Sequence, residues 1–131
     1  MNTKETMYVP SGRFYIVDDD LSFGKSLKRV LNARGIRADY FGSAQSFLDS
    51  VPPSDPGYAI VDIHMPVCDG FALMDKMHDM HFSMRVIVIT GQTQTDTREL
   101  ALQKGAVGFL QKPFSAESLL ELITQDMCDS D

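Results

Sequence analysis

The sequence predicts a doubly wound α/β fold with a central parallel sheet, and three observations support this prediction. Short strand-like segments alternate with longer segments of helical periodicity, and this pattern occurs five times along the 131 residues. The strand segments are largely apolar, as in a sheet that helices cover on both faces. Turn-forming residues separate the segments. With right-handed crossovers, such alternation leaves few topologies other than a doubly wound sheet.

The first two strand–helix units lie before residue 50. Phe14–Val17 is a short apolar strand, and the apolar residues of 23–31 recur at the spacing of a helix. Ile36–Phe41 is the second predicted strand. Ser43 is a suitable N-cap for a short helix through Asp49.

The third unit follows a segment rich in proline. Residues 51–57 contain three prolines and a glycine and are predicted to be a loop. Tyr58–Val61 is a fully apolar strand that ends at Asp62. Residues 71–77 carry Phe and Met at helical spacing and predict the next helix.

The last two units complete the pattern. Arg85–Thr90 is the most strand-like segment of the chain, and Thr95–Lys104 is a helix that Gly105 ends. Val107–Gln111 is a short strand. After it, Ser115 caps a final helix with a leucine-rich face.

Composition excludes several functional classes. One compact domain suits this length, and the formal net charge of −6 argues against a nucleic-acid-binding surface. No apolar segment is long enough to cross a membrane and no signal peptide begins the chain, so we expect a cytoplasmic protein without membrane contact. Cys68 and Cys128 are expected to be free thiols, because neither their spacing nor the three histidines suggest a disulfide or a zinc site.

Chemically active side chains follow four of the predicted strands. In doubly wound folds, ligands bind at the carboxyl ends of the strands. Those ends carry Asp18 and Asp19, Asp62, Thr90 and Lys112. Converging carboxylates imply a cation between them, and a set of few carboxylate oxygens suits Mg²⁺ together with a phosphate. Lys112 supplies positive charge, Thr90 a hydroxyl, and one carboxylate can be the nucleophile that forms an aspartyl phosphate.

The motifs at these strand ends resemble those of the response-regulator receiver domain, in the CheY-like superfamily. The resemblance covers roughly residues 13–127, and its Thr-Gly pair and glycine-rich run look most like FixJ-type receivers. The pieces that carry it are Asp18-Asp19, Asp62-Ile63-His64-Met65-Pro66-Val67-Cys68-Asp69-Gly70, Ile89-Thr90-Gly91 and Phe109-Leu110-Gln111-Lys112-Pro113-Phe114.

The resemblance implies a fold and the boundaries of the domain. It implies a flavodoxin-like (βα)₅ fold with strand order 2-1-3-4-5. The receiver domain would span residues 12–128, with a short N-terminal extension at 1–11 and a C-terminal tail at 129–131. It also implies a cis Lys112-Pro113 peptide bond, which aims the amine at the site.

The resemblance assigns a role to each candidate residue. Asp62 would accept the phosphoryl group, and Asp19, Asp62 and the backbone carbonyl of His64 would ligate Mg²⁺, with Asp18 acting through coordinated water. Thr90 and Lys112 would hold the phosphoryl oxygens. Phe109 would occupy the switch position, where the family often has Tyr. Loop or capping roles are expected for Asp20 and Asp69.

The resemblance also implies partners. The phosphoryl group would come from a phosphohistidine of a sensor kinase or a phosphotransfer protein. Apart from its own phosphorylation and slow dephosphorylation, the domain would have no enzymatic activity. A downstream protein would bind the surface formed by the fourth helix, fifth strand and fifth helix, and the family's behaviour allows a phosphorylation-dependent dimer. No direct nucleic-acid binding is expected.

Three other interpretations fit parts of the sequence. The order of Asp18, Thr90 and Lys112 also suits a haloacid-dehalogenase phosphatase, but that class needs a later acidic motif, and the acids from Asp126 onward lie at an expected frayed end. The segment 21–26 ends like a phosphate-binding P-loop but lacks its first glycine. A degenerate receiver that serves only as an interaction module would lack some of the site residues, and all are present.

Overall fold

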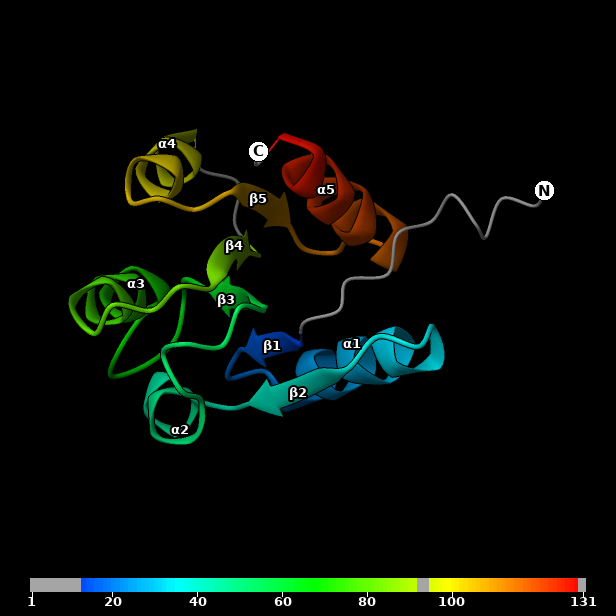
Figure 1. Ribbon diagram of the computed structural model, residues 1–131, viewed down its shortest axis with the longest axis horizontal. Coiled ribbons are helices and arrows are strands. Elements are labelled where there is room, and N and C mark those ends of the chain that lie inside the picture. The colour runs from blue at the N-terminus through cyan, green and yellow to red at the C-terminus, as the bar shows by residue number, and fades with distance from the viewer. Residues whose placement is uncertain (1–12, 92–94, 130–131) are drawn as a thin grey trace.

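The computed structural model of the chain describes residues 13–91 and 95–129, in which five parallel strands and five helices form a doubly wound sheet (Figure 1). The strand order is β2-β1-β3-β4-β5, which confirms the predicted fold and topology. The proposed segment 1–11 lies outside the described residues, and the limits of the domain stay a prediction. In chain order the elements are β1 (Phe14–Val17), α1 (Leu21–Ala33), β2 (Ala38–Phe41), α2 (Ala44–Ser50), β3 (Tyr58–Asp62), α3 (Gly70–Asp79), β4 (Arg85–Thr90), α4 (Thr95–Gln103), β5 (Gly108–Gln111) and α5 (Ala116–Asp129).

Helices cover both faces of the sheet. Figure 1 shows α1 and α5 on one face and α2, α3 and α4 on the other. Successive side chains of a strand point to opposite faces, so Phe14 and Ile16 of β1 join the hydrophobic cluster under α1 and α5. Tyr15 and Val17 join the cluster on the other face. Burial on both faces explains why the inner strands are nearly continuous apolar segments.

Two strands begin later than their sequence pattern suggests. Ile36, predicted to begin a strand, instead donates its backbone N–H to the carbonyl of Leu31 at the end of α1. Gly35 makes this ending possible, because its φ of +82° lies in the left-handed region. The fifth strand likewise begins at Gly108 rather than at Val107.

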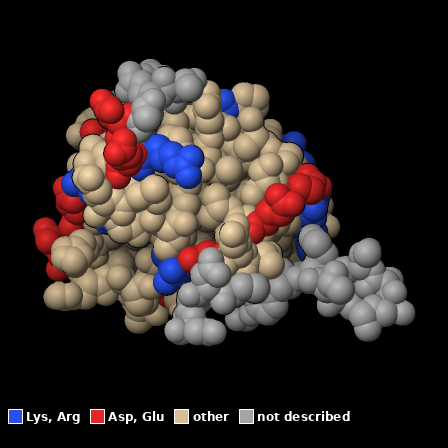
Figure 2. All heavy atoms as spheres, turned by 90° about the horizontal axis from the view of Figure 1, so that it is seen from above, with Lys and Arg blue, Asp and Glu red and all other residues tan. Residues whose placement is uncertain are grey.

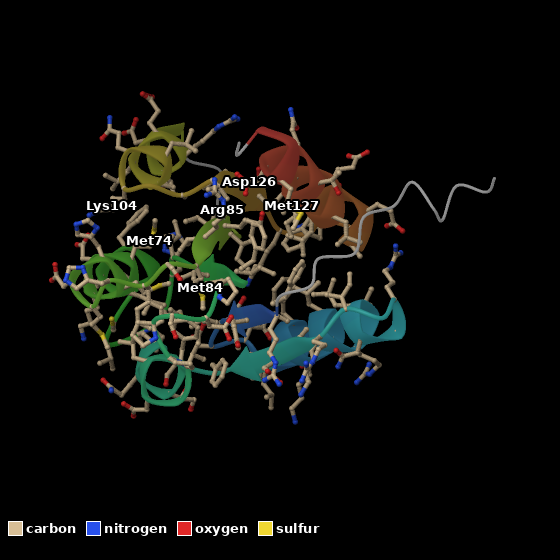
Figure 3. All side chains as sticks on the ribbon, in the orientation of Figure 1. Met74, Met84, Arg85, Lys104, Asp126 and Met127 are labelled. Carbon is tan, nitrogen blue, oxygen red and sulfur yellow. The ribbon has the colours of Figure 1, made fainter. Side chains whose placement is uncertain are left out.

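The side chain of Asp126 links the last helix to two strands and is not frayed. Arg85 donates to it twice, from Nε to Oδ2 at 2.5 Å and from Nη2 to Oδ1 at 2.7 Å (Figure 3). The Tyr58 hydroxyl donates to Oδ2 at 2.7 Å. Tyr58 and Arg85 begin β3 and β4, so Asp126 lies at the opposite edge of the sheet from Asp62. The prediction that the chain is frayed here is therefore wrong for Asp126. Its three hydrogen bonds also make this carboxylate unavailable as a metal ligand in a phosphatase-type site.

Replacing Asp126 with Ala should lower the free energy of unfolding by about 2 kcal/mol at neutral pH, because the buried Tyr58 hydroxyl loses its acceptor. Burial alone would raise the pKa of Asp126, but hydrogen bonds from Arg85 and Tyr58 lower it below its usual range. The ionised carboxylate of Asp126 therefore contributes its full stabilisation above the unfolded-state pKa of about 3.9. This stabilisation is lost as the pH falls through the lower folded-state pKa. Urea unfolding of both proteins across this range checks the prediction. A constant difference down to the most acidic pH would contradict it.

The distribution of charged side chains on the surface agrees with the net negative charge of the sequence. On the face seen in Figure 2, basic and acidic side chains form small separate groups, and no broad basic area covers the described part of that face. Within residues 13–91 and 95–129, no helix is both long and apolar enough to cross a bilayer.

Candidate functional site

The predicted site residues meet at one edge of the sheet. Asp18 directly follows β1, Asp62 and Thr90 are the last residues of β3 and β4, and Lys112 directly follows β5. Since the strands are parallel, their carboxyl ends meet at the same edge. The connections that leave β1 and β3 lead to α1 and α3 on opposite faces of the sheet, and such a switch point is where doubly wound folds bind ligands.

Three carboxylates converge there. Oxygens of Asp18, Asp19 and Asp62 lie within 4.8 Å of one another. Asp18 and Asp62 are buried, whereas Asp19 is exposed. Burial raises the pKa of Asp18, and the charge of Asp62 adds to this effect against the ammonium of Lys112. The cluster therefore favours a cation.

Lys112 is the positive group of the site. Its Nζ lies 2.7 Å from Oδ2 of Asp18 and 3.6 Å from Oδ2 of Asp62, and only 18% of its side chain is exposed. Burial alone would lower the pKa of Lys112, but the two carboxylates outweigh burial and raise it. The ammonium therefore stays charged beside the proposed acceptor. The Lys112-Pro113 bond is cis, as predicted.

The site fits a hard divalent cation. Oδ2 of Asp18 is fully buried, and the ammonium of Lys112 lies 2.7 Å from it. All three side chains offer oxygen ligands, the type that Mg²⁺ prefers.

Asp20 and Asp69 have the capping roles that the sequence suggested. Asp20 caps α1, where its Oδ1 accepts from the N–H of Phe23 at 3.1 Å. Asp69 caps α3, where its Oδ1 accepts from the N–H of Ala72 at 2.8 Å. The two caps fix the helix starts that border the acidic cluster.

The loop after Asp62 packs tightly against the end of β3. The N–H of His64 donates to Oδ1 of Asp62 at 3.1 Å, which orients the carboxylate. At Gly70, a Cβ atom would lie 2.8 Å from the carbonyl oxygen of Asp62 and 2.7 Å from the Cα of Ile63. The glycine therefore allows α3 to begin against the strand that carries the proposed acceptor.

Val67, in the same loop, has a strained backbone that the sequence did not reveal. Its φ is +69°, and the N–H of Cys68 donates to the carbonyl of Pro66 at 2.7 Å, closing a three-residue turn around it. Such γ-turns are rare, and positive φ is unusual for a β-branched residue. The side chain is fully exposed, so no packing within the domain offsets a strain of about 1–3 kcal/mol.

Tyr40 is a further site residue that sequence reasoning missed. Its hydroxyl donates to the backbone carbonyl of Asp18 at 2.6 Å and so holds the end of β1. Burial and then the neighbouring acids raise the pKa of Tyr40, which keeps this donor protonated. A Cβ atom at Gly24 would lie 2.1 Å from the Tyr40 ring, so the glycine of α1 makes room for the tyrosine. A glycine inside a helical pattern was the only sequence signal.

Thr90 and Phe109, the residue predicted at the switch position, lie on the neighbouring strands β4 and β5. Thr90 is fully buried at the end of β4, and its carbonyl accepts from the N–H of Lys112 at 2.7 Å. Phe109 of β5 pairs with Val88 of β4 and is half-buried against the cluster under α3. The structure thus places Thr90 beside the site and Phe109 on the adjacent strand toward α4.

Comparisons with known proteins agree with this geometry. The profile of the response regulator receiver domain family matches residues 14–124. The transcriptional regulatory protein FixJ of Bradyrhizobium diazoefficiens is 33% identical over 112 residues, which are 86% of this chain and 55% of that protein. The DNA-binding transcriptional regulator NtrC of Klebsiella pneumoniae is 34% identical over 86% of this chain and 24% of its own length. The chain therefore spans about half or less of these relatives.

A solved structure has the same fold. The crystal structure of FixJ-N superposes with a TM-score of 0.83 at 30% identity and covers 92% of this chain and 97% of that one. The similarity thus extends from the sequence to the arrangement of the sheet and helices.

Proposed function

Because the chain belongs to the receiver-domain family of two-component response regulators, we propose that Asp62 is the aspartate that accepts the phosphoryl group. Members of this family are phosphoacceptor domains. One observation carries the assignment to Asp62. Asp62 is the buried carboxylate that ends the central strand β3, and it lies 3.6 Å from the amine of Lys112.

The residues of the site would have different roles in phosphoryl transfer. An oxygen of Asp62 attacks the phosphorus atom of a phosphohistidine, the new O–P bond forms, and the P–N bond breaks with its electron pair left on the imidazole. Lys112 and the hydroxyl of Thr90 hold the phosphoryl oxygens. Water later attacks the phosphorus, which releases phosphate and restores the Asp62 carboxylate. The domain would catalyse only these reactions on itself.

Asp18, Asp19 and Asp62, with the backbone carbonyl of His64, would hold Mg²⁺. The ion supplies positive charge that neutralises the acids and the incoming phosphoryl oxygens. In our assignment Asp18 acts through coordinated water. The carboxylate oxygens that converge within 4.8 Å support the three aspartates of this ligand set.

The proposed partners follow from the same chemistry. A sensor histidine kinase or a phosphotransfer protein would supply the phosphoryl group. A downstream protein would bind α4, β5 and α5, where Leu100 and Leu102 of α4 expose large apolar side chains. A phosphorylation-dependent dimer through this surface is part of the proposal.

Phosphorylation should change this surface through Thr90 and Phe109. The Thr90 hydroxyl should move toward the phosphoryl group, and the Phe109 ring into the vacated space. This is a shift between two existing arrangements, and charge-assisted hydrogen bonds can supply much of the free energy. NMR spectra with and without Mg²⁺ and beryllofluoride, a mimic of the acyl phosphate, check the prediction. Shifts that stop at the loops around Asp62 and never reach Phe109 or α4 would exclude this route.

A labelling experiment tests the proposed function itself. The chain should incorporate phosphate from acetyl phosphate in the presence of Mg²⁺, through a bond that hydroxylamine cleaves, as expected for an acyl phosphate. A chain that stays unlabelled, or whose label resists hydroxylamine, would contradict the proposal.

A further inference from the structure

The ammonium of Lys112 contacts an aromatic ring as well as the two carboxylates. Its Nζ lies 4.3 Å from the centroid of the Phe23 ring, well within the range of a cation–π interaction. In the sequence, Phe23 is only one apolar position of the first helix. The contact joins the first turn of α1 to the loop after β5.

The position of the Phe23 ring is well defined. The N–H of Phe23 donates to the capping carboxylate of Asp20 at 3.1 Å, which fixes its backbone at the start of α1. On the other side, its ring meets the ring of Phe114 edge to face, with centroids 5.7 Å apart and planes at 73°. The ring is therefore a fixed surface against which Lys112 lies.

The electrostatics of the ring suit the environment of Lys112. The side chain of Lys112 is mostly buried, so its ammonium has lost much of its water. The negative face of an aromatic ring replaces part of that hydration without adding a formal charge. A leucine at residue 23 would fill much of the same space but attract no cation. Phe23 packs against the hydrophobic cluster under α1 and α5, and it also borders a surface groove of about 250 Å³.

We propose that Phe23 is a positioning residue for phosphoryl transfer, which holds the Lys112 ammonium beside Asp62 before the phosphoryl group arrives. The inference rests on the role proposed for Lys112. To contact the phosphoryl oxygens, the ammonium must share or leave its contact with Asp18, at 2.7 Å. A cation is attracted anywhere over the ring face within about 6 Å of the centroid, so the contact persists while the ammonium moves across that face. A pre-positioned amine lowers the entropy lost on reaching the transition state.

Fluorinated phenylalanines at residue 23 test this role, because fluorine removes negative charge from the ring face while nearly preserving its shape. The rate of labelling by acetyl phosphate should fall stepwise with one, two and three fluorines, reaching about three- to tenfold with three. Phe23→Leu should be slowed as much, whereas Phe23→Tyr should stay close to the wild type. The ε-methylene protons of Lys112 should show an upfield ring-current shift that Phe23→Leu removes.

The same fluorinated residues at Phe82 are the matched control. Phe82 is half-buried and packs against Phe47 in the cluster on the other face of the sheet, so its fluorination should not change the rate. Equal rates across the series at residue 23, or a Phe23→Leu variant labelled as fast as the wild type, would overturn the proposal. An unlabelled wild-type chain would instead overturn the proposed function, so the two failures are distinguishable.

Discussion

The Asp62→Asn variant should take up phosphate from acetyl phosphate at least about a thousandfold more slowly than the wild type. The amide keeps the shape of the carboxylate but lacks the nucleophilic oxygen anion. The fold should persist, because the amide oxygen can still accept from the N–H of His64 and Lys112 keeps its ion pair with Asp18. Loss of one of three mutually repelling carboxylates should not destabilise the domain.

Asp69→Asn is the matched control for this variant. Asp69 caps α3, and Asn caps helices about as well as Asp, so this variant should be labelled like the wild type. Intact-protein mass spectrometry measures the labelling, and thermal unfolding confirms that both variants are folded. Hydroxylamine-sensitive labelling of Asp62→Asn at the wild-type rate would refute the assignment of the acceptor.

Removal of Mg²⁺ should have the second-largest effect and reduce labelling to background. Three carboxylates and one ammonium leave the site with a formal charge of −2, so an incoming phosphoryl group is repelled. A divalent cation cancels this charge. Labelling is measured in excess chelator and again after Mg²⁺ is restored, at constant ionic strength. Unchanged labelling in chelator would contradict the metal site.

Variants at two neighbouring acids distinguish direct metal binding from a general effect of charge on Mg²⁺ affinity. Asp19→Asn should weaken Mg²⁺ binding, because the exposed Asp19 belongs to the converging oxygens. Asp20→Asn removes the same charge one residue later but keeps the helix cap, so it should bind Mg²⁺ nearly normally. NMR titration with Mg²⁺ alone reports both affinities without any phosphoryl donor. Equal affinities of the two variants would show that Asp19 is not a ligand.

Much of this site could be predicted because it lies at strand ends. Asp18, Asp62, Thr90 and Lys112 follow or end strands whose apolar character is plain in the sequence, and parallel pairing brings those ends together. The capping aspartates were also readable, since a cap is a local pattern within four residues. The strand order came from the family resemblance rather than from the residue pattern.

Contacts between distant segments could not be read in the same way. Tyr58, Arg85 and Asp126 come from two strands and the last helix, and no periodicity shows that they share hydrogen bonds. The Tyr40 contact with Asp18 and the Phe23 contact with Lys112 likewise depend on how α1 and β2 lie against the rest of the fold. Their residue types were visible, but their partners were not.

Backbone strain was hidden for a different reason. The positive φ of Val67 is set by the short loop between Asp62 and α3, which must turn before the helix starts at Gly70. A β-branched residue predicts the opposite conformation, because positive φ is unfavourable for it. The requirement of the turn overrides the local preference of valine.

Chemical trapping of the acyl phosphate tests the central claim most directly. Borohydride reduces an aspartyl phosphate to homoserine, so the labelled residue is marked permanently and peptide mass spectrometry can locate it. After incubation with acetyl phosphate and Mg²⁺, homoserine should appear at position 62 and not at the neighbouring acids Asp18, Asp19 or Asp69. Homoserine at one of those positions, with none at 62, would contradict the account.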